Sequence, residues 1–261
     1  MTLLMQVSDP HFGTDRPAVL AALENLWRQH APDLLLMTGD ITQRARVPEF
    51  RAAREFVDRL APAAFLAIPG NHDIPLFDVW SRCAHPYQRF QQHFHGALEG
   101  CFQDGEVMVI AINTTRWYRH KNGEVSKAQI EQVARQLRDA GPLRCKVVAV
   151  HQPVAVTRDS DRANLLRGHE AAVRAWAEAG ADLVMGGHIH LPFIVPLRER
   201  WPSLPRPMFA VQAGTAVSTR IRGKVPNSVQ LVDLNEQWTV ERWDFDEEQV
   251  CFMRVEGRVL R

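Results

Sequence analysis

Short runs of Leu, Val, Ile and Met alternate with longer segments of helical periodicity along most of this 261-residue chain. In residues 16–29 the apolar side chains Val19, Leu20, Leu23 and Leu26 are spaced one, three and three apart, which is typical of a helix with one buried face. We expect strands at residues 2–8, 33–38, 63–69, 106–113, 145–151 and 181–187, and helices at 16–29, 48–60, 126–140 and 169–180. This alternation predicts parallel pairing in a layered α/β domain.

Residues 78–100 and the last quarter of the chain depart from this alternation. Strand-like runs at residues 207–214, 227–234, 238–245 and 249–255 follow one another with turn residues between them, so we expect an antiparallel part of the sheets there. Residues 78–100 form an aromatic and His-rich insertion, which we expect to be helical and to act as a lid. The chain has no repeat or low-complexity tail in its sequence, and we expect a single domain over residues 1–261.

Polar side chains follow five of the expected strands. The segments read SDPHFG, TGDITQ, PGNHDIP, VAVHQP and GGHIHLP, and open α/β sheets bind ligands at the carboxyl ends of their strands. Glycines at positions 39, 70, 186 and 187 adjoin them, which indicates tight turns and close approach of the backbone. The side chains brought to this edge are Asp9, His11, Asp40, Asn71, His72, Asp73, His151, His188 and His190.

The GGHIH segment contains two histidines that are two positions apart. If the strand continues to its end, His188 and His190 point to the same side, because residues two apart on a strand share a face. Two converging imidazoles can bind a metal ion, but taken alone such a segment is more often an ordinary polar loop. The whole set of His, Asp and Asn side chains favours the metal site.

The charge balance and the cysteine pattern exclude several classes of protein. With 31 basic and 30 acidic residues the chain has no broad field for holding long nucleic acid. Cys83, Cys101, Cys145 and Cys251 are scattered singly, so we expect reduced thiols and no zinc knuckle. The N-terminus lacks a signal-peptide pattern, and no apolar run approaches the roughly 20 residues that span a membrane. We expect a cytoplasmic protein with no membrane partner; whether it forms a homo-oligomer stays open.

The motifs DxH, GD, GNHD, a lone His after a strand, and GHxH occur in this order from Asp9 to His190. In this the chain resembles the calcineurin-like metallophosphoesterases. The resemblance implies a four-layer αββα sandwich of two mixed β-sheets flanked by helices, with a two-metal site at the carboxyl edge of the strands. It assigns one metal to Asp9, His11, Asp40 and His190 and the other to Asp40, Asn71, His151 and His188, with Asp40 bridging.

The chemistry of such a centre explains these residue types. Two divalent ions about 3.5–4 Å apart lower the pKa of a shared water, so that a bridging hydroxide can attack phosphorus in line. Imidazole and carboxylate ligands suit Mn, Fe, Zn or Co, and no thiolate biases the site toward zinc. Two dications with Asp9, Asp40 and a hydroxide carry a net charge of about +1, which matches a phosphodiester better than a phosphomonoester.

His72 receives no metal in this pattern. The resemblance points its ring toward the leaving-group oxygen, so we assign it as general acid or as a stabiliser of transition-state charge. Asp73 would orient the imidazole and favour its cationic form, or would only cap the following turn.

Other cations could contact a substrate, although each also reads as an ordinary surface residue. The arginines are Arg44, Arg46, Arg116 and Arg220. The histidines that a lid could present are His85, His93, His95 and His120.

The branch of the superfamily decides the substrate. GNHDIP, NTTR and AGTAVSTRIRGKVPNS resemble the bacterial class III cyclic nucleotide phosphodiesterases and their glycerophosphodiesterase-like relatives, so we expect a small nucleotide-type diester such as a 3',5'-cyclic nucleotide. The alternatives are a nucleotide-sugar or lipid pyrophosphatase, which needs an apolar cleft, and a nuclease, in which Trp117, Tyr118 and Arg119 could stack a base. An inactive interaction scaffold is disfavoured, because every expected ligand is retained.

Overall fold

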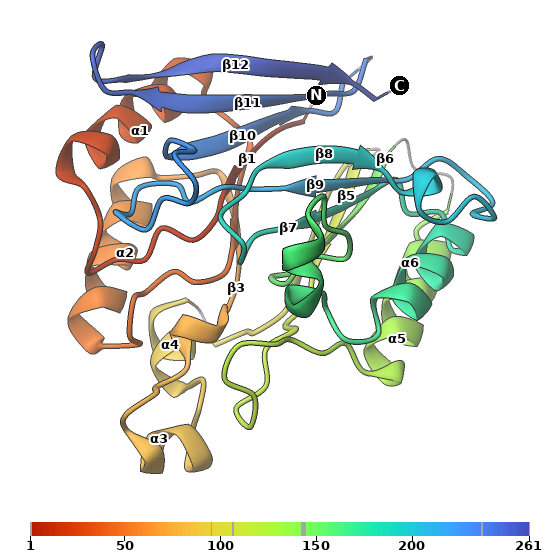
Figure 1. Cartoon of the computed structure of the whole chain (residues 1–261), viewed down its shortest axis with the longest axis horizontal. Coiled ribbons are helices and arrows are strands. Elements are labelled where there is room, and N and C mark those ends of the chain that lie inside the picture. The colour runs from red at the N-terminus through yellow and green to blue at the C-terminus, as the bar shows by residue number, and fades with distance from the viewer. Residues whose placement is uncertain (1, 95, 106, 142–144, 236, 261) are drawn as a thin grey trace.

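The computed structural model describes residues 2–94, 96–105, 107–141, 145–235 and 237–260. Two six-stranded sheets lie between layers of helices (Figure 1). The first sheet has the order β12 (Cys251–Val259), β11 (Thr239–Asp246), β10 (Ser228–Asp233), β1 (Leu3–Val7), β2 (Leu34–Thr38) and β3 (Ala64–Ile68). The second has the order β4 (Gly100–Asp104), β5 (Val107–Ala111), β6 (Cys145–Ala149), β7 (Leu183–Gly186), β9 (Phe209–Gln212) and β8 (Phe193–Pro196). The predicted four-layer αββα sandwich is confirmed.

Both sheets are mixed. Strands β1, β2 and β3 pair in parallel, as do β5, β6, β7 and β9, and the other pairs are antiparallel. The antiparallel character expected for residues 207–214 is wrong in part, because β9 pairs antiparallel with β8 but parallel with β7. Strands β4 and β8 were not expected, since β4 is largely exposed and the four residues of β8 are too few for a clear pattern. The predicted start of the fourth strand at Glu106 lies outside the described residues.

Alternate side chains of each strand enter different apolar layers. Met5 and Val7 of β1 pack under α1 (Pro17–His30) and α2 (Val47–Leu60), whereas Leu4 packs between the two sheets. The second sheet packs in the same way against α5 (Lys127–Asp139) and α6 (His169–Glu178). Close packing on both faces fixes the strands, and so fixes the loops at their carboxyl ends.

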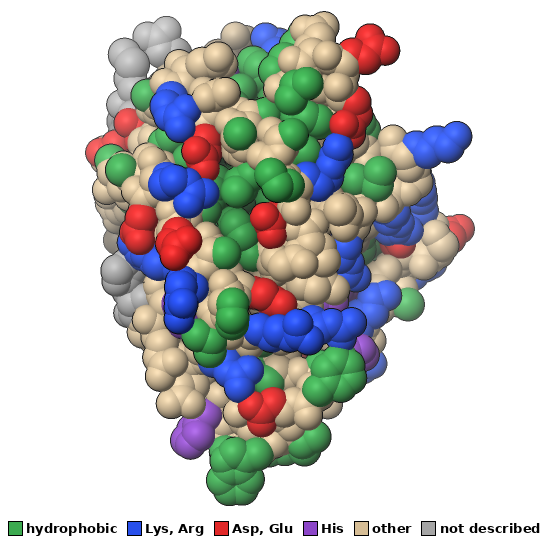
Figure 2. All heavy atoms as spheres, turned by 90° about the vertical axis from the view of Figure 1, so that its left-hand side faces the viewer, with side chains coloured by type: hydrophobic (Ala, Val, Ile, Leu, Met, Phe, Trp, Pro, Cys, Tyr) green, Lys and Arg blue, Asp and Glu red, His purple; other side chains and the backbone are tan. Residues whose placement is uncertain are grey.

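The insertion at residues 78–100 is helical, as expected, but its two helices differ. α4 (Gln88–His93) buries Phe90 against α2, with the ring centroid 6.4 Å from that of Phe50. α3 (Val79–Ala84) buries no side chain, and Trp80 is 79% exposed. Figure 2 shows hydrophobic side chains gathered at the lower tip of the molecule, at the level of α3 in Figure 1. Within the described part of this insertion, α3 therefore agrees better with a lid than α4 does.

No helix in the described part of the chain has the length and apolar character that a membrane crossing requires.

Candidate metal centre

The polar residues after the strands meet at one edge of the two sheets. Asp9 follows β1, Asp40 follows β2 and Asn71 follows β3 of the first sheet, while His151 and the GGHIH segment follow β6 and β7 of the second. Parallel strands in both sheets end at this edge, so their loops face one another across it.

Five of these residues have a left-handed backbone. The φ angle is 50° at Asp9, 44° at His11, 49° at Asp40, 74° at His188 and 53° at His190. Residues other than Gly seldom adopt this conformation, which costs on the order of 1–3 kcal/mol and persists only where the surrounding structure holds it. Strain of this kind gathers at binding and catalytic sites.

The geometry of GGHIH differs from the expected one. β7 ends at Gly186, so His188 and His190 lie in a loop and not on a strand. Left-handed turns, and not the alternation of a strand, aim the two rings. The rings go to different partners: His190 Nε2 lies 3.2 Å from Asp9 Oδ1, whereas the His188 ring centroid lies 5.1 Å from that of His151.

Glycine is required at two positions because carboxylates approach the backbone closely. A Cβ atom at Gly187 would overlap Asp9 Oδ2, and one at Gly70 would overlap Asp40 Oδ1. The same turn directs a backbone donor at the first carboxylate, since the N–H of His188 donates to Asp9 Oδ2 at 2.9 Å. These glycines therefore bring the loops into contact with the ligand candidates.

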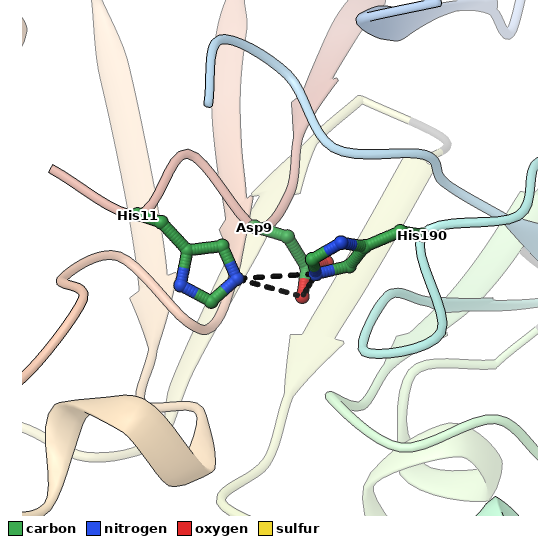
Figure 3. A group of neighbouring side chains, drawn as sticks. All are labelled: Asp9, His11 and His190. Atoms are coloured by element: carbon green, nitrogen blue, oxygen red, sulfur yellow. Dashed lines mark hydrogen bonds and ion pairs between the residues drawn. The ribbon is translucent and has the colours of Figure 1, made fainter. Parts of the chain in front are cut away.

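Asp9, His11 and His190 form the first group of side chains (Figure 3). His11 Nε2 lies 3.1 Å from His190 Nε2 and 4.0 Å from Asp9 Oδ1. The three ligand atoms lie within 4.8 Å of one another. Two imidazole nitrogens and a carboxylate oxygen at this spacing can surround one divalent ion.

Asp40, His151 and His188 form the second group, also with ligand atoms within 4.8 Å of one another. His151 Nε2 lies 3.3 Å from Asp40 Oδ1. The other oxygen of the same carboxylate, Oδ2, lies 3.8 Å from His11 Nε2 in the first group. Asp40 therefore faces both groups, one oxygen to each.

Within the described part of the chain, four side-chain atoms of the second group and of the neighbouring Asn71 are buried and have no hydrogen-bond partner. They are Asn71 Oδ1, His151 Nε2, and His188 Nδ1 and Nε2. One ring nitrogen of His188 can bind an ion, so three of these atoms are candidate ligand atoms. Buried polar atoms are nearly always paired, so unpaired atoms that converge need an explanation. A cation bound by these three atoms supplies one, and the residues present therefore fit a metal ion.

Backbone carbonyl oxygens hold two of the imidazoles through their Nδ1 atoms. His151 Nδ1 lies 2.8 Å from the Thr38 carbonyl oxygen, and His190 Nδ1 lies 2.6 Å from the Arg220 carbonyl oxygen. A proton held on Nδ1 by such a contact leaves Nε2 as the lone-pair donor, which is how proteins set the tautomer of a metal-binding histidine.

The charge states in the centre also suit metal binding. Burial lowers the pKa of both His11 and His188 to about 3, so these imidazoles are neutral near pH 7. Burial would raise the pKa of Asp9, but the charge of His190 outweighs it and lowers the pKa to about 2. The neutral imidazoles of His11 and His188 and the charged carboxylate of Asp9 are in the form in which these groups ligate. Burial would lower the pKa of His151 and His190, but the neighbouring carboxylates outweigh it and raise both, that of His151 to about 9, so a bound ion would displace a proton from each of these two rings.

The ring of His72 is held at the edge of the centre. Its centroid lies 4.8 Å from that of His11, and its Nδ1 lies 2.8 Å from the Gln43 carbonyl oxygen. Arg220 Nη1 lies 3.0 Å from His72 Nε2. Arg220 is therefore in direct contact with the predicted catalytic histidine.

The contacts of Asp73 differ from the expected contact with the His72 imidazole. Its buried carboxylate accepts hydrogen bonds from the backbone N–H groups of Ile41 at 3.0 Å, Thr42 at 2.7 Å and Gly70 at 2.8 Å. It ties the GNHD turn to the loop after β2, and the His72 ring is oriented by Gln43 instead. The alternative expectation, that Asp73 stabilises a turn, agrees better with these contacts.

An open cleft of about 810 Å³ lies over both groups. Its lining includes Asp40, Asn71, His72, His188 and His190.

The remaining predicted contact residues divide between the cleft and other places. Arg220 and His120 line the cleft. Arg44 lies over the Phe77 ring at 5.2 Å, and Arg116 donates to Gln129 Oε1 at 2.6 Å.

One of the histidines that a lid could present, His93, lies away from the centre. The His93 ring stacks on Phe50 in the helix layer, with centroids 5.5 Å apart. His95 lies outside the described residues.

The polar residues of the cleft that sequence reasoning missed include Asp161, Asn164 and Arg222. Asp161 and Asn164 lie well beyond the end of β6, where no strand-end pattern marks them. Arg222 follows the named Arg220 by two positions, and the TRIRG segment was the only signal that could have pointed to it.

Known proteins share this sequence pattern and this fold. A probable cyclic nucleotide phosphodiesterase from Synechococcus sp. is 28% identical over 212 residues, which make up 74% of this chain and 76% of that protein. A probable glycerophosphodiester phosphodiesterase from Arcobacter nitrofigilis is 26% identical over 161 residues, 61% of this chain and 57% of that protein. The purple acid phosphatase from yellow lupin (Lupinus luteus) seeds superposes with a TM-score of 0.71 at 11% identity; this covers 99% of our chain and about half, 53%, of the plant chain.

The family model described as calcineurin-like phosphoesterase matches residues 2–192, which contain every expected ligand from Asp9 to His190. The match spans well over half of the 261 residues. The chain therefore belongs to the calcineurin-like phosphoesterase family of dimetal hydrolases.

Proposed function

We propose that the protein hydrolyses small phosphodiesters with two divalent metal ions, and that a 3',5'-cyclic nucleotide is the favoured type of substrate. One observation carries the proposal: two His/Asp groups share Asp40 between them at the base of an open cleft. The phosphodiesterase names of both curated relatives support the diester over a monoester. The choice of cyclic nucleotide rests on the relative that covers more of this chain.

The proposed ligand sets give each ion four protein ligands. Asp9, His11, Asp40 and His190 would hold one ion, and Asp40, Asn71, His151 and His188 the other. Mn, Fe, Zn and Co all suit this oxygen and nitrogen donor set. When bound, the two ions would activate water for attack on phosphorus and stabilise negative charge on the phosphoryl oxygens.

His72 and Arg220 would act on the substrate from the edge of the cleft. The Arg220 guanidinium lies beside His72 Nε2, so both groups can reach the same bound phosphodiester. The guanidinium would pair with the phosphoryl oxygens, and the ring would give a proton to the leaving oxygen. Gln43 holds Nδ1 throughout, so Nε2 is the atom that exchanges the proton.

The segment of residues 74–84 would form a lid at the rim of the cleft. Leu76 lines the cleft, and the exposed side chains of Phe77 and Trp80 follow it. Arg82 donates to the carbonyl oxygens of Pro75 and Arg119. The second bond connects this segment to the loop that carries His120.

A substrate panel on metal-reconstituted protein tests the proposal. The panel holds 3',5'-cyclic nucleotides, glycerophosphodiesters, nucleotide-sugar diphosphates, single-stranded DNA and bis(4-nitrophenyl) phosphate. We expect the cyclic nucleotides to be cleaved with the highest kcat/KM. The Asp40→Ala variant should lose hydrolysis and, by elemental analysis, bind well below two equivalents of metal.

Two other results would redirect the proposal. Preference for nucleotide-sugar diphosphates or DNA would identify a pyrophosphatase or a nuclease with the same centre. No hydrolysis of any panel member by protein that holds two metal equivalents would point to an interaction scaffold.

A further inference from the structure

Two buried hydrogen-bond acceptors in the cleft wall have no role in the metal centre. Asp161 and Asn164 belong to the short 3-10 helix η2 (Asp159–Asn164) and line the same cleft as the metal ligands. Asp161 is 1% exposed and Asn164 is 7% exposed. One oxygen of each side chain, Asp161 Oδ2 and Asn164 Oδ1, has no hydrogen-bond partner among the residues that the structure describes.

This acceptor pair is braced against the loop that carries the metal-binding histidines. Arg222 Nη2 donates to Asp161 Oδ1 at 2.7 Å, and Arg222 Nη1 donates to the carbonyl oxygen of Ile189 at 2.9 Å. Ile189 lies between His188 and His190 in the sequence. Asn164 Nδ2 also lies 3.4 Å from Asp161 Oδ1. These contacts hold Asp161 and Asn164 in place, and the two unpaired oxygens, Asp161 Oδ2 and Asn164 Oδ1, are left for a further hydrogen-bond donor.

Given the phosphodiesterase activity proposed above, we propose that Asp161 and Asn164 accept hydrogen bonds from a hydroxyl group on an ester substituent of the substrate. Two unpaired acceptors select a ligand that donates. Buried polar atoms of this kind cost free energy until a ligand satisfies them, and an analogue without the donor leaves them unpaired.

The charge of the wall favours a neutral hydroxyl over an ammonium group. Arg222 already neutralises Asp161 in an ion pair, and Lys121 and Arg220 also line the cleft. A cationic head group would meet this excess of positive charge, whereas a hydroxyl would not. Ribose and glycerol both place a hydroxyl near a phosphate ester, so the chemistry is shared by nucleotide and glycerol diesters.

Two matched substrate pairs separate these sources. The first pair is adenosine 3',5'-cyclic phosphate and its 2'-deoxy analogue. The second is glycerol 4-nitrophenyl phosphate and propyl 4-nitrophenyl phosphate, which share a leaving group and differ only in hydroxyls. We expect kcat/KM to favour the hydroxylated member of at least one pair by about 10- to 100-fold, the effect of leaving one or two buried acceptors unpaired. The pair that discriminates identifies the source of the hydroxyl.

Variants on η2 assign the effect to the acceptors. Asn164→Leu keeps the approximate size of the side chain and removes its oxygen, so the preference ratio should fall toward one. Arg162→Gln is the matched control, because the Arg162 side chain is 68% exposed and pairs with Asp159 at the surface; it should retain the ratio. Asn164→Ala serves the same purpose if circular dichroism shows that Asn164→Leu is unfolded.

Equal kcat/KM within both pairs for the wild-type protein would overturn the inference, and this comparison needs no variant. A preference that survives in folded Asn164→Leu and Asn164→Ala would overturn it too. Failure of the parent proposal looks different, because the wild-type protein would then not cleave even bis(4-nitrophenyl) phosphate, and the inference would fall with it.

Discussion

Asp9 and Asp40 combine a left-handed backbone with a buried carboxylate, and neither is favourable by itself. Their identity as ligand candidates could be predicted from the sequence, because each follows an apolar strand and stands in a DxH or GD motif. Their φ angles could not, since these depend on how loops from two sheets pack against each other. The same holds for His188 and His190, for which strand alternation gave the wrong local geometry but the right neighbourhood.

Gly187→Ala should damage the first metal site without changing any ligand. The new Cβ would overlap Asp9 Oδ2 and Ser8 Oγ, so the carboxylate must move. We expect metal affinity to fall about 10- to 100-fold, the loss typical of disturbing the groups that orient a ligand. Titration with Mn²⁺ followed by calorimetry measures it. Gly100→Ala is the control, because its Cβ meets only the end of the flexible Leu66 side chain; a similar loss there would mean that the overlap is not the cause.

His72→Ala and Arg220→Met should differ in their dependence on the leaving group. A histidine that donates a proton matters most for a poor leaving group, so His72→Ala should slow alkyl esters by about 10²–10⁴ and 4-nitrophenyl esters much less. Arg220 holds charge and gives no proton, so Arg220→Met should slow both esters to a similar degree. Both variants should keep two equivalents of metal. If His72→Ala slowed alkyl and 4-nitrophenyl esters by the same factor, His72 would be assigned to the stabilisation of transition-state charge instead.

At the scale of elements, the helices and parallel strands were predictable because each carries a complete periodic pattern. Helix α5 begins as its sequence indicates, with Ser126 Oγ accepting a hydrogen bond from the Gln129 backbone N–H. The sequence predicts a lid that includes the residues of α4, because a run rich in aromatic residues has the same pattern whether it covers a site or a core. Only the position of Phe50 and Phe94 around Phe90 decides for the core, and this is a tertiary contact.

Asp73→Ala should act on stability. Its carboxylate accepts three backbone hydrogen bonds that join the GNHD turn to the loop after β2, and the alanine would leave those donors buried and unpaired. We expect the free energy of unfolding to fall by about 3 kcal/mol, measured by urea denaturation. Asp78→Ala removes the N-cap of α3 and a partly exposed ion pair with Arg89, and should cost only about 1 kcal/mol. Unchanged stability with a large loss of kcat would restore Asp73 to a role in orienting His72.

Trp80→Ser tests the lid proposed for residues 74–84. If the exposed indole covers a bound substrate, its loss should raise KM for bulky diesters by about tenfold and leave KM for a dimethyl ester nearly unchanged. Met253→Ser, at an exposed position on β12, is the control. Equal KM values in wild type and Trp80→Ser for every diester would remove the lid.

At the scale of the whole molecule, each sheet supplies only part of the centre. The first sheet brings Asp9, Asp40 and Asn71 on its loops, and the second brings His151 and the GGHIH segment. Neither sheet carries all of the candidate ligands, so the packing of the two sheets assembles the site. Figure 1 shows the two sheets facing each other, and a change in their packing would move the loops of one sheet relative to those of the other.

Anomalous scattering from manganese in crystals of wild type, His188→Ala and His190→Ala tests the two-metal centre most directly. We predict two peaks about 3.5–4 Å apart in the wild-type protein, on either side of Asp40. With limiting manganese, His190→Ala should lose the peak beside Asp9 and His11, and His188→Ala the peak beside His151. A single peak in the wild type, or loss of the same peak in both variants, would contradict the division of the GGHIH histidines between two ions.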